Sequence, residues 1–102
     1  MSEREKRKAS EDYTQLFLRV SEAAKTADVL ILDEMLSACN HNVVPRELVA
    51  DFLCHKPENL EVVLTGRNPP REFLELADYV TQMQKVKHPF DQGIPARKGI
   101  EY

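Results

Sequence analysis

Two short apolar blocks constrain the fold of this chain more than any other feature of its sequence. Residues 29–32 read Val-Leu-Ile-Leu between Asp28 and Asp33, and residues 60–64 read Leu-Glu-Val-Val-Leu. Branched apolar residues in runs this short are typical of strands buried on both faces of a sheet. Such strands require helices that cover them, so the two blocks predict an α/β arrangement.

The segments around these blocks predict helices and a third strand. Apolar spacing and proline positions predict helices at residues 9–25, 34–39, 45–55 and 71–77. Ser10 is a candidate N-cap of the first helix. Partial alternation with Val80 and Thr81 predicts a strand at 79–86, at or near a sheet edge.

The alternation of helices and strands is typical of a parallel sheet. We therefore predict a small three-layer α/β unit with a partial parallel sheet, whose strands lie near 28–33, 61–65 and 79–86. The predicted organisation is a charged N-terminal extension at 1–8, the α/β domain at 9–86 and an irregular tail at 87–102. A chain of 102 residues, 42% of them hydrophobic, suits one such domain.

Charge and hydropathy exclude several classes of protein. The formal net charge is −3, but residues 1–8 and 85–102 each carry four basic and two acidic residues, so the middle of the chain holds a net −7. An acidic body argues against nucleic-acid binding. The longest apolar run is four residues, and the charged start lacks the apolar core of a signal peptide. We expect a cytoplasmic protein without a membrane partner.

Two acids follow the first apolar block. Asp33 and Glu34 would stand at the carboxyl end of a buried parallel strand, where ligands bind in open α/β sheets. Carboxylate oxygens suit a hard cation such as Mg²⁺. The competing interpretation is that Asp33 caps the next helix and Glu34 favours its N-terminus. Spacing alone leaves both interpretations open.

A polar loop follows the second block. In Thr65-Gly66-Arg67-Asn68, Gly66 permits a tight turn or the close approach of a ligand, and Arg67 offers a fixed fork of donors to an anion. The alternative is an ordinary loop with a solvated arginine. The four-residue segment is therefore a candidate binding loop.

The sequence lacks the common patterns of phosphate-binding, zinc-binding and nucleophilic sites. A P-loop requires G-x-x-x-x-G-K-[ST], but Gly93 and Gly99 are one residue too far apart and Ile100 follows the second glycine. Two cysteines next to or near histidines lack zinc-site spacing, so we interpret Cys39 and Cys54 as buried thiols beside surface histidines. No nucleophilic Cys-His arrangement is predicted, and no catalytic residue is assigned.

Four segments together resemble the C-terminal half of the P-loop-type ATP:cob(I)alamin (corrinoid) adenosyltransferases. The N-terminal half of that family, which carries the P-loop, has no counterpart in these 102 residues. The most specific segment is the tail, with its order of Lys87, His88, Phe90, Asp91, Gly93, Ala96, Lys98 and Gly99. The other three are Val29-Leu-Ile-Leu-Asp-Glu-Met, Val62-Val-Leu-Thr-Gly-Arg-Asn-Pro-Pro and Phe73-Leu-Glu-Leu-Ala-Asp-Tyr-Val. The resemblance runs from about the middle of the first predicted helix to Tyr102.

The resemblance implies the C-terminal half of a P-loop NTPase-like (RecA-like) fold and a role in cobalamin biosynthesis. Enzymes of this family transfer the 5′-deoxyadenosyl group of ATP to a cobalt(I) corrinoid, use Mg²⁺ and work as homodimers. By resemblance, Glu34 and Asp33 would hold the metal, with Glu34 the stronger candidate. Thr65, Arg67 and Asn68 would bind the nucleotide.

Because the sequence has no P-loop pattern, we expect the chain to be inactive alone. We expect it to act with an N-terminal P-loop half or a full-length homologue, as a homo-oligomer. The alternative is a non-catalytic dimerisation or interaction module derived from the same fold. Loss of neighbouring strands would leave the 28–33 strand with an unpaired edge or an uncovered face, which favours association with another chain.

Overall fold

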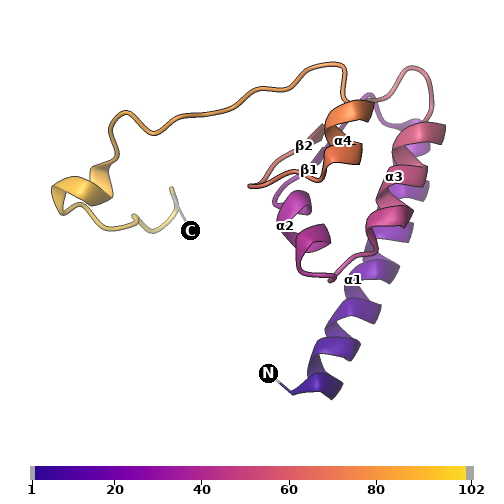
Figure 1. Ribbon diagram of the computed structural model, residues 1–102, viewed down its shortest axis with the longest axis horizontal. Helices are drawn as coiled ribbons and strands as arrows, with labels where there is room; N and C mark the ends of the chain where they lie inside the picture. The colour runs from indigo at the N-terminus through magenta and orange to yellow at the C-terminus, as the bar shows by residue number, and fades with distance from the viewer. Residues whose placement is uncertain (1, 101–102) are drawn as a thin grey trace.

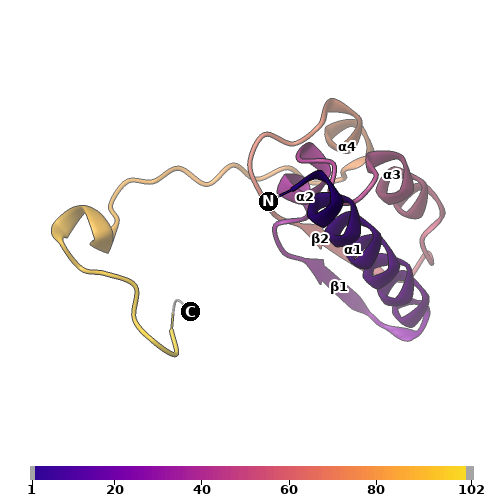
Figure 2. The same ribbon diagram turned by 90° about the horizontal axis from the view of Figure 1, so that it is seen from below.

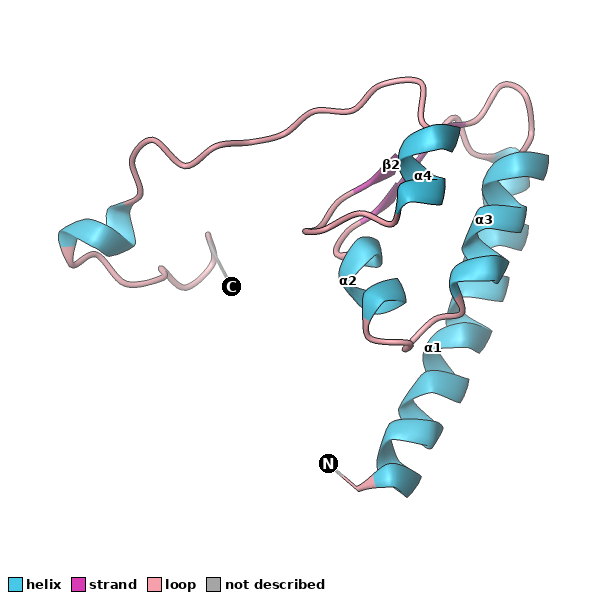
Figure 3. Cartoon of the chain, in the orientation of Figure 1, coloured by secondary structure: helices cyan, strands magenta, loops and turns pink. Residues whose placement is uncertain are grey.

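The computed structural model describes residues 2–100, which form an α/β body followed by an extended tail (Figure 1). Helices and strands alternate along the body as expected, and Figure 3 shows these elements coloured by type. In order, the elements are α1 (Glu3–Ala23), a 3-10 turn (Ala24–Thr26), β1 (Val29–Leu32), α2 (Met35–Asn40), α3 (Arg46–His55), β2 (Glu61–Leu64), α4 (Arg71–Leu76) and a 3-10 turn in the tail (Pro89–Gln92).

The sheet consists of β1 and β2, which pair in parallel. Leu30 lies beside Val62 and Leu32 lies beside Leu64 in the register. The connection from β1 to β2 runs through α2 and α3, as a parallel pair requires a crossover. The two apolar blocks therefore form the two strands that the sequence predicts, with the predicted direction.

The predicted third strand at 79–86 is wrong. This segment carries no strand within the part of the chain that the structure describes, and the sheet there has two strands. The side chains of Tyr79 and Met83 are 93% and 94% exposed. Figure 1 shows the chain leaving the body after α4 and running away from the sheet. A segment with β propensity forms a strand only where it packs and pairs, and this one pairs with no strand among the described residues.

The sheet is covered on one face only, so the prediction of three layers and of strands buried on both faces is wrong for the described residues. Val29, Ile31 and Val63 share one face and are 56%, 64% and 44% exposed. Leu30 and Leu32 point to the opposite face, which packs against the helices. Figure 2 shows α1, α3 and α4 gathered on the same side of the strands.

The first helix begins earlier than expected. Ser2 is its N-cap, and the Ser2 hydroxyl accepts a hydrogen bond from the Glu5 amide at 3.1 Å. The N-cap predicted at Ser10 is therefore wrong: Ser10 lies inside α1, and its hydroxyl donates to the carbonyl of Val43 at 2.9 Å. Acids in the first turn and good helix formers among the charged residues extend the helix into the segment 1–8 from Glu3 onward.

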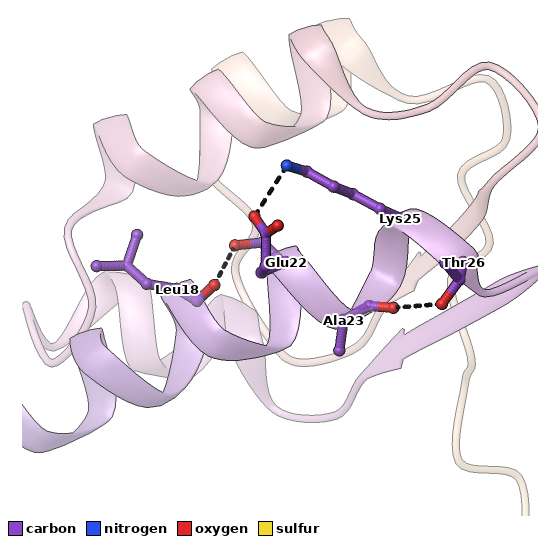
Figure 4. A network of polar contacts seen from close by, with 6 residues as sticks. Leu18, Glu22, Ala23, Lys25 and Thr26 are labelled. Atoms are coloured by element: carbon purple, nitrogen blue, oxygen red, sulfur yellow. Dashed lines mark hydrogen bonds and ion pairs between the residues drawn. The ribbon is translucent and has the colours of Figure 1, made fainter.

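The far end of α1 tightens into the 3-10 turn before β1. Figure 4 shows the contacts that close it: Lys25 pairs with Glu22 at 2.9 Å, and the Thr26 hydroxyl donates to the carbonyl of Ala23 at 3.3 Å. Hydroxyl donors of this kind satisfy carbonyls that a helix end leaves without a partner. The chain then turns directly into β1.

An apolar core lies between the covered sheet face and the helices. Phe17 of α1 meets Phe52 of α3 edge to face, with ring centroids 5.7 Å apart and an interplanar angle of 86°. The buried members of this core are Phe17, Leu32, Leu36, Cys39, Val44, Val49 and Phe73. α3 and α4 follow Pro45 and Pro70, so the prolines start these helices as the sequence predicts.

No helix among residues 2–100 is both long enough and apolar enough to cross a membrane.

Candidate functional site

The ends of the two strands are joined by the side chain of Thr65. The Thr65 hydroxyl donates to Oδ1 of Asp33 at 2.6 Å and accepts a hydrogen bond from the Glu34 amide at 2.8 Å. The backbone continues the parallel ladder here, since the Thr65 amide donates to the carbonyl of Leu32 at 3.3 Å. Thr65 therefore ties both acids that follow β1 to the end of β2.

This arrangement bears on the helix-capping interpretation of Asp33 and Glu34, and Glu34 does stand at the N-terminus of α2 as that interpretation expects. The N-cap position of α2 is held by Glu34, and no side chain caps the helix there. Asp33 accepts from Thr65 instead, so its assignment as the helix cap is wrong. Glu34 has a left-handed backbone, with φ of 58°, and its carboxylate makes no hydrogen bond or ion pair with any described residue. The Glu34 carboxylate is thus available to a ligand.

Gly66 brings the candidate binding loop against the start of α2. Its φ is 141°, and a Cβ placed on it would lie 2.7 Å from Cβ of Leu36. The Leu36 amide donates to the carbonyl of Thr65 at 3.2 Å, just before the glycine. Only glycine allows this backbone and this approach. The sequence predicted a tight turn or the close approach of a ligand at this glycine. Here the close neighbour is α2.

Arg67 and Asn68 lie exposed beyond the glycine. The backbone of Asn68 is left-handed, with φ of 53°. Asn40, at the end of α2, donates from Nδ2 to the carbonyl of Asn68 at 2.8 Å and to that of Arg67 at 3.2 Å. The Arg67 guanidinium makes no ion pair within residues 2–100, so its donors remain open to an anion.

The loop and α2 enclose an open pocket of about 390 Å³. Three predicted site residues, Glu34, Arg67 and Asn68, line it. Asp33 and Thr65 do not line the pocket. They are linked to Glu34 by the two hydrogen bonds of the Thr65 hydroxyl. The structure thus brings the acidic pair and the candidate binding loop, which are about 30 residues apart in sequence, to one end of the sheet.

Sequence reasoning missed the α2 side of the pocket. The remaining lining residues are Ser37, Asn40 and His41. His41 Nδ1 lies 2.9 Å from the carbonyl of Ser37, one turn earlier. The available signal was the spacing: residues 34, 37 and 41 lie on one face of a helix.

The donor set fits a magnesium ion in part. No cluster of three or more metal-ligating side chains exists among the described residues. Mg²⁺, however, is commonly held by one or two carboxylates together with substrate phosphates and water. Glu34, whose exposed carboxylate has no partner among the described residues, would supply one such ligand, and Asp33 stands beside it with one oxygen engaged by Thr65. The residues present suit a metal that arrives with a phosphate ligand.

The cysteines lie apart from this chemistry. Cys39 is buried, and burial raises the pKa of its thiol, an effect that Arg46 partly opposes and that Glu72 and Glu47 reinforce. Cys54 is exposed, so the expectation of two buried thiols holds for Cys39 and is wrong for Cys54. His41 and His55 are at the surface as expected.

Comparison with known proteins identifies the family. Residues 1–102 match the family model of the ATP:corrinoid adenosyltransferases BtuR/CobO/CobP. The corrinoid adenosyltransferase of Escherichia coli K12 is 39% identical over 80 residues, which is 78% of this chain and 41% of that protein. Salmonella typhimurium corrinoid adenosyltransferase CobA is 39% identical over 74% of this chain and 38% of its own length. A corrinoid adenosyltransferase from a Sinorhizobium species is 41% identical over 72% of this chain and 35% of its own length.

The chain spans about two fifths of the length of the curated relatives it matches. The match to the family model nevertheless extends over the whole sequence. The chain therefore belongs to the ATP:corrinoid adenosyltransferase family.

Proposed function

We propose that this chain supplies the metal-binding and part of the nucleotide-binding side of an ATP:corrinoid adenosyltransferase, and that it acts with a polypeptide that carries the P-loop. The observation that carries the proposal is the shared pocket of Glu34 and Arg67 at the carboxyl ends of two parallel strands. A free carboxylate and a free guanidinium in one pocket match the two halves of a magnesium–triphosphate group.

In this reaction the main role of the protein is to bind and orient the two substrates. The cobalt(I) corrinoid is the nucleophile, and the 5′ carbon of ATP is attacked while triphosphate leaves, so no side chain needs to form a covalent bond. Arg67 donates hydrogen bonds to phosphate oxygens and stabilises the charge that grows on the leaving group. Asn68 offers a short polar side chain beside it, and Thr65 keeps the Asp33 carboxylate in place.

Glu34, with Asp33 beside it, would hold Mg²⁺, which when bound neutralises phosphate charge. Glu34 is the better ligand because its carboxylate has no partner among the described residues, whereas Asp33 accepts from Thr65. Removal of the Glu34 charge should therefore weaken the metal-dependent binding of ATP more than removal of the Asp33 charge.

The exposed face and open edges of the sheet favour association with a partner chain. Val29, Ile31 and Val63 form an exposed apolar face, and β1 and β2 each have one edge without a strand partner in residues 2–100. Open edges and apolar faces favour pairing with another chain. The 102 residues also hold no P-loop pattern, so the backbone cradle for the triphosphate has to come from elsewhere.

The same exposed face favours one alternative, a non-catalytic module that associates with a second copy or with a full-length relative. In that case the pocket at Glu34 would be a remnant without activity. The two functions differ in what the P-loop partner gains on association: cobalt–carbon bond formation in the first case, and none in the second.

A complementation experiment tests the proposal. The chain is mixed with a purified N-terminal P-loop portion of a corrinoid adenosyltransferase, ATP, Mg²⁺ and reduced corrinoid, and the cobalt–carbon product is followed by absorbance. We expect activity only in the mixture. Activity of the chain alone would overturn the need for a partner, and association without activity would select the non-catalytic module.

Two matched glutamate-to-glutamine variants test whether Glu34 contributes to the activity of the mixture. Glu34→Gln removes the proposed ligand charge with little change in volume, and we expect most of the activity of the mixture to be lost while association persists. Glu58→Gln makes the same change at an exposed position before β2, at the opposite end of the strand, and should leave the activity unchanged. Equal activity of both variants would contradict the assignment of Glu34.

A further inference from the structure

Among the described residues, the part of the loop that follows Gly66 is hydrogen-bonded to α2 through one side chain. Asn40 Nδ2 donates to two successive carbonyls, those of Arg67 at 3.2 Å and Asn68 at 2.8 Å. No other hydrogen bond among the described residues engages the backbone of residues 66–69. An amide with two donors is well suited to bind two adjacent carbonyls at once.

The loop needs such a contact because its backbone is unusual. Gly66 and Asn68, on either side of Arg67, both have positive φ, at 141° and 53°. A non-glycine residue in the left-handed region is disfavoured unless its surroundings hold it there. Loss of the two hydrogen bonds would let residues 67–69 relax toward other backbone conformations, since Arg67 and Asn68 are exposed to solvent.

We propose that Asn40 is a positioning residue, which fixes the backbone of Arg67 and Asn68 so that the Arg67 guanidinium is held at the pocket formed with Glu34. The contact itself is independent of the proposed function, and its consequence for ATP binding rests on that function. Preorganisation of a binding arginine lowers the entropy that must be lost when the anion binds. Asn40 thus acts through Arg67 and need not touch the substrate.

Limited proteolysis of the complete chain reports how mobile the loop is, with and without the Asn40 contact. Trypsin cleaves after Arg67 when the loop is mobile, and cleavage after Arg46, at the start of α3, reports unfolding of the body. We take the ratio of the two cleavage rates in native conditions. Asn40→Asp keeps the shape of the side chain but replaces its donors with a carboxylate, so we expect the ratio to rise about tenfold.

A conservative variant separates positioning from general destabilisation. Asn40→Gln keeps an amide donor on a longer side chain, and its ratio should lie closer to wild type than that of Asn40→Asp. The proposal is overturned if the ratio is unchanged in Asn40→Asp, if Asn40→Gln behaves as Asn40→Asp does, or if cleavage after Arg46 and after Arg67 accelerate equally.

The complementation mixture tests the consequence for the nucleotide. Asn40→Asp should raise the KM for ATP several-fold and leave kcat within about twofold, because an arginine that is less well held weakens binding before it affects chemistry. A loss confined to kcat would overturn the positioning role. If the wild-type mixture is inactive, the proposed function fails, and the proteolysis ratio still decides whether Asn40 holds the loop.

Discussion

The Thr65 hydroxyl donates a hydrogen bond of 2.6 Å to the Asp33 carboxylate, which joins the carboxyl ends of the two parallel strands through side chains. The same hydroxyl accepts from the Glu34 amide at 2.8 Å. One threonine thus satisfies groups on both acids of the site. Its position follows from the register, in which Leu32 lies beside Leu64.

Replacement of Thr65 should reveal this link. Thr65→Val keeps the volume but removes donor and acceptor together, and we expect the free energy of unfolding to fall by about 1–2 kcal/mol, since a typical hydrogen bond contributes about 1 kcal/mol. Thr65→Ser keeps the hydroxyl and should retain most of the stability. Urea unfolding followed by circular dichroism measures both variants. Equal losses in the two would show that the methyl group, and not the hydroxyl, matters.

Gly66→Ala should destabilise the chain more than the same change at Gly93. Both glycines have positive φ, but an added Cβ at Gly66 meets Cβ of Leu36 at 2.7 Å, whereas nothing lies within 4 Å at Gly93. We expect a loss of about 1–3 kcal/mol for Gly66→Ala from strain and displacement of α2. Thermal unfolding of the two variants compares them. A larger effect at Gly93 would contradict the close approach.

Two adjacent residues of β1 should differ in how much their truncation destabilises the chain. Leu32 is in the core and Ile31 lies on the open sheet face. Leu32→Ala should cost about 2–4 kcal/mol of unfolding free energy, because it leaves a cavity, whereas Ile31→Ala should cost less than about 1 kcal/mol. Equilibrium denaturation of the isolated chain gives both values. Similar losses would mean that the open face is covered in solution.

The two cysteines should differ in their reaction with iodoacetamide. Burial raises the pKa of the Cys39 thiol, so less of the reactive thiolate is present at any pH below that raised value, and the buried sulfur is also shielded. We expect Cys54 to be alkylated rapidly near pH 8 and Cys39 slowly, with the rate at Cys39 increasing as pH rises. Mass spectrometry of the tryptic peptides measures each site. In denaturant the two rates should converge, and equal rates in the native protein would contradict the burial of Cys39.

Much of the body was predictable because its signals are local. The branched apolar blocks predicted β1 and β2, and Pro45 and Pro70 marked the starts of α3 and α4. The direction of pairing followed from the order of helices and strands, since parallel strands need a crossover. The resemblance to a RecA-like half fold and the division at residues 8 and 86 stay predictions.

The sequence by itself determined that the acidic pair and the polar loop each follow a strand, and the order of the elements predicted that parallel pairing would bring Glu34 and Arg67 to one edge of the sheet. Only the tertiary structure decided that residues 79–86 stay out of the sheet, that Val29 and Ile31 face solvent, and that Asn40 reaches the loop at Arg67. The physical reason is that periodicity and turn residues act within a few positions along the chain. Strand pairing, coverage of a face and side-chain contacts between distant segments depend instead on which neighbours the folded chain provides.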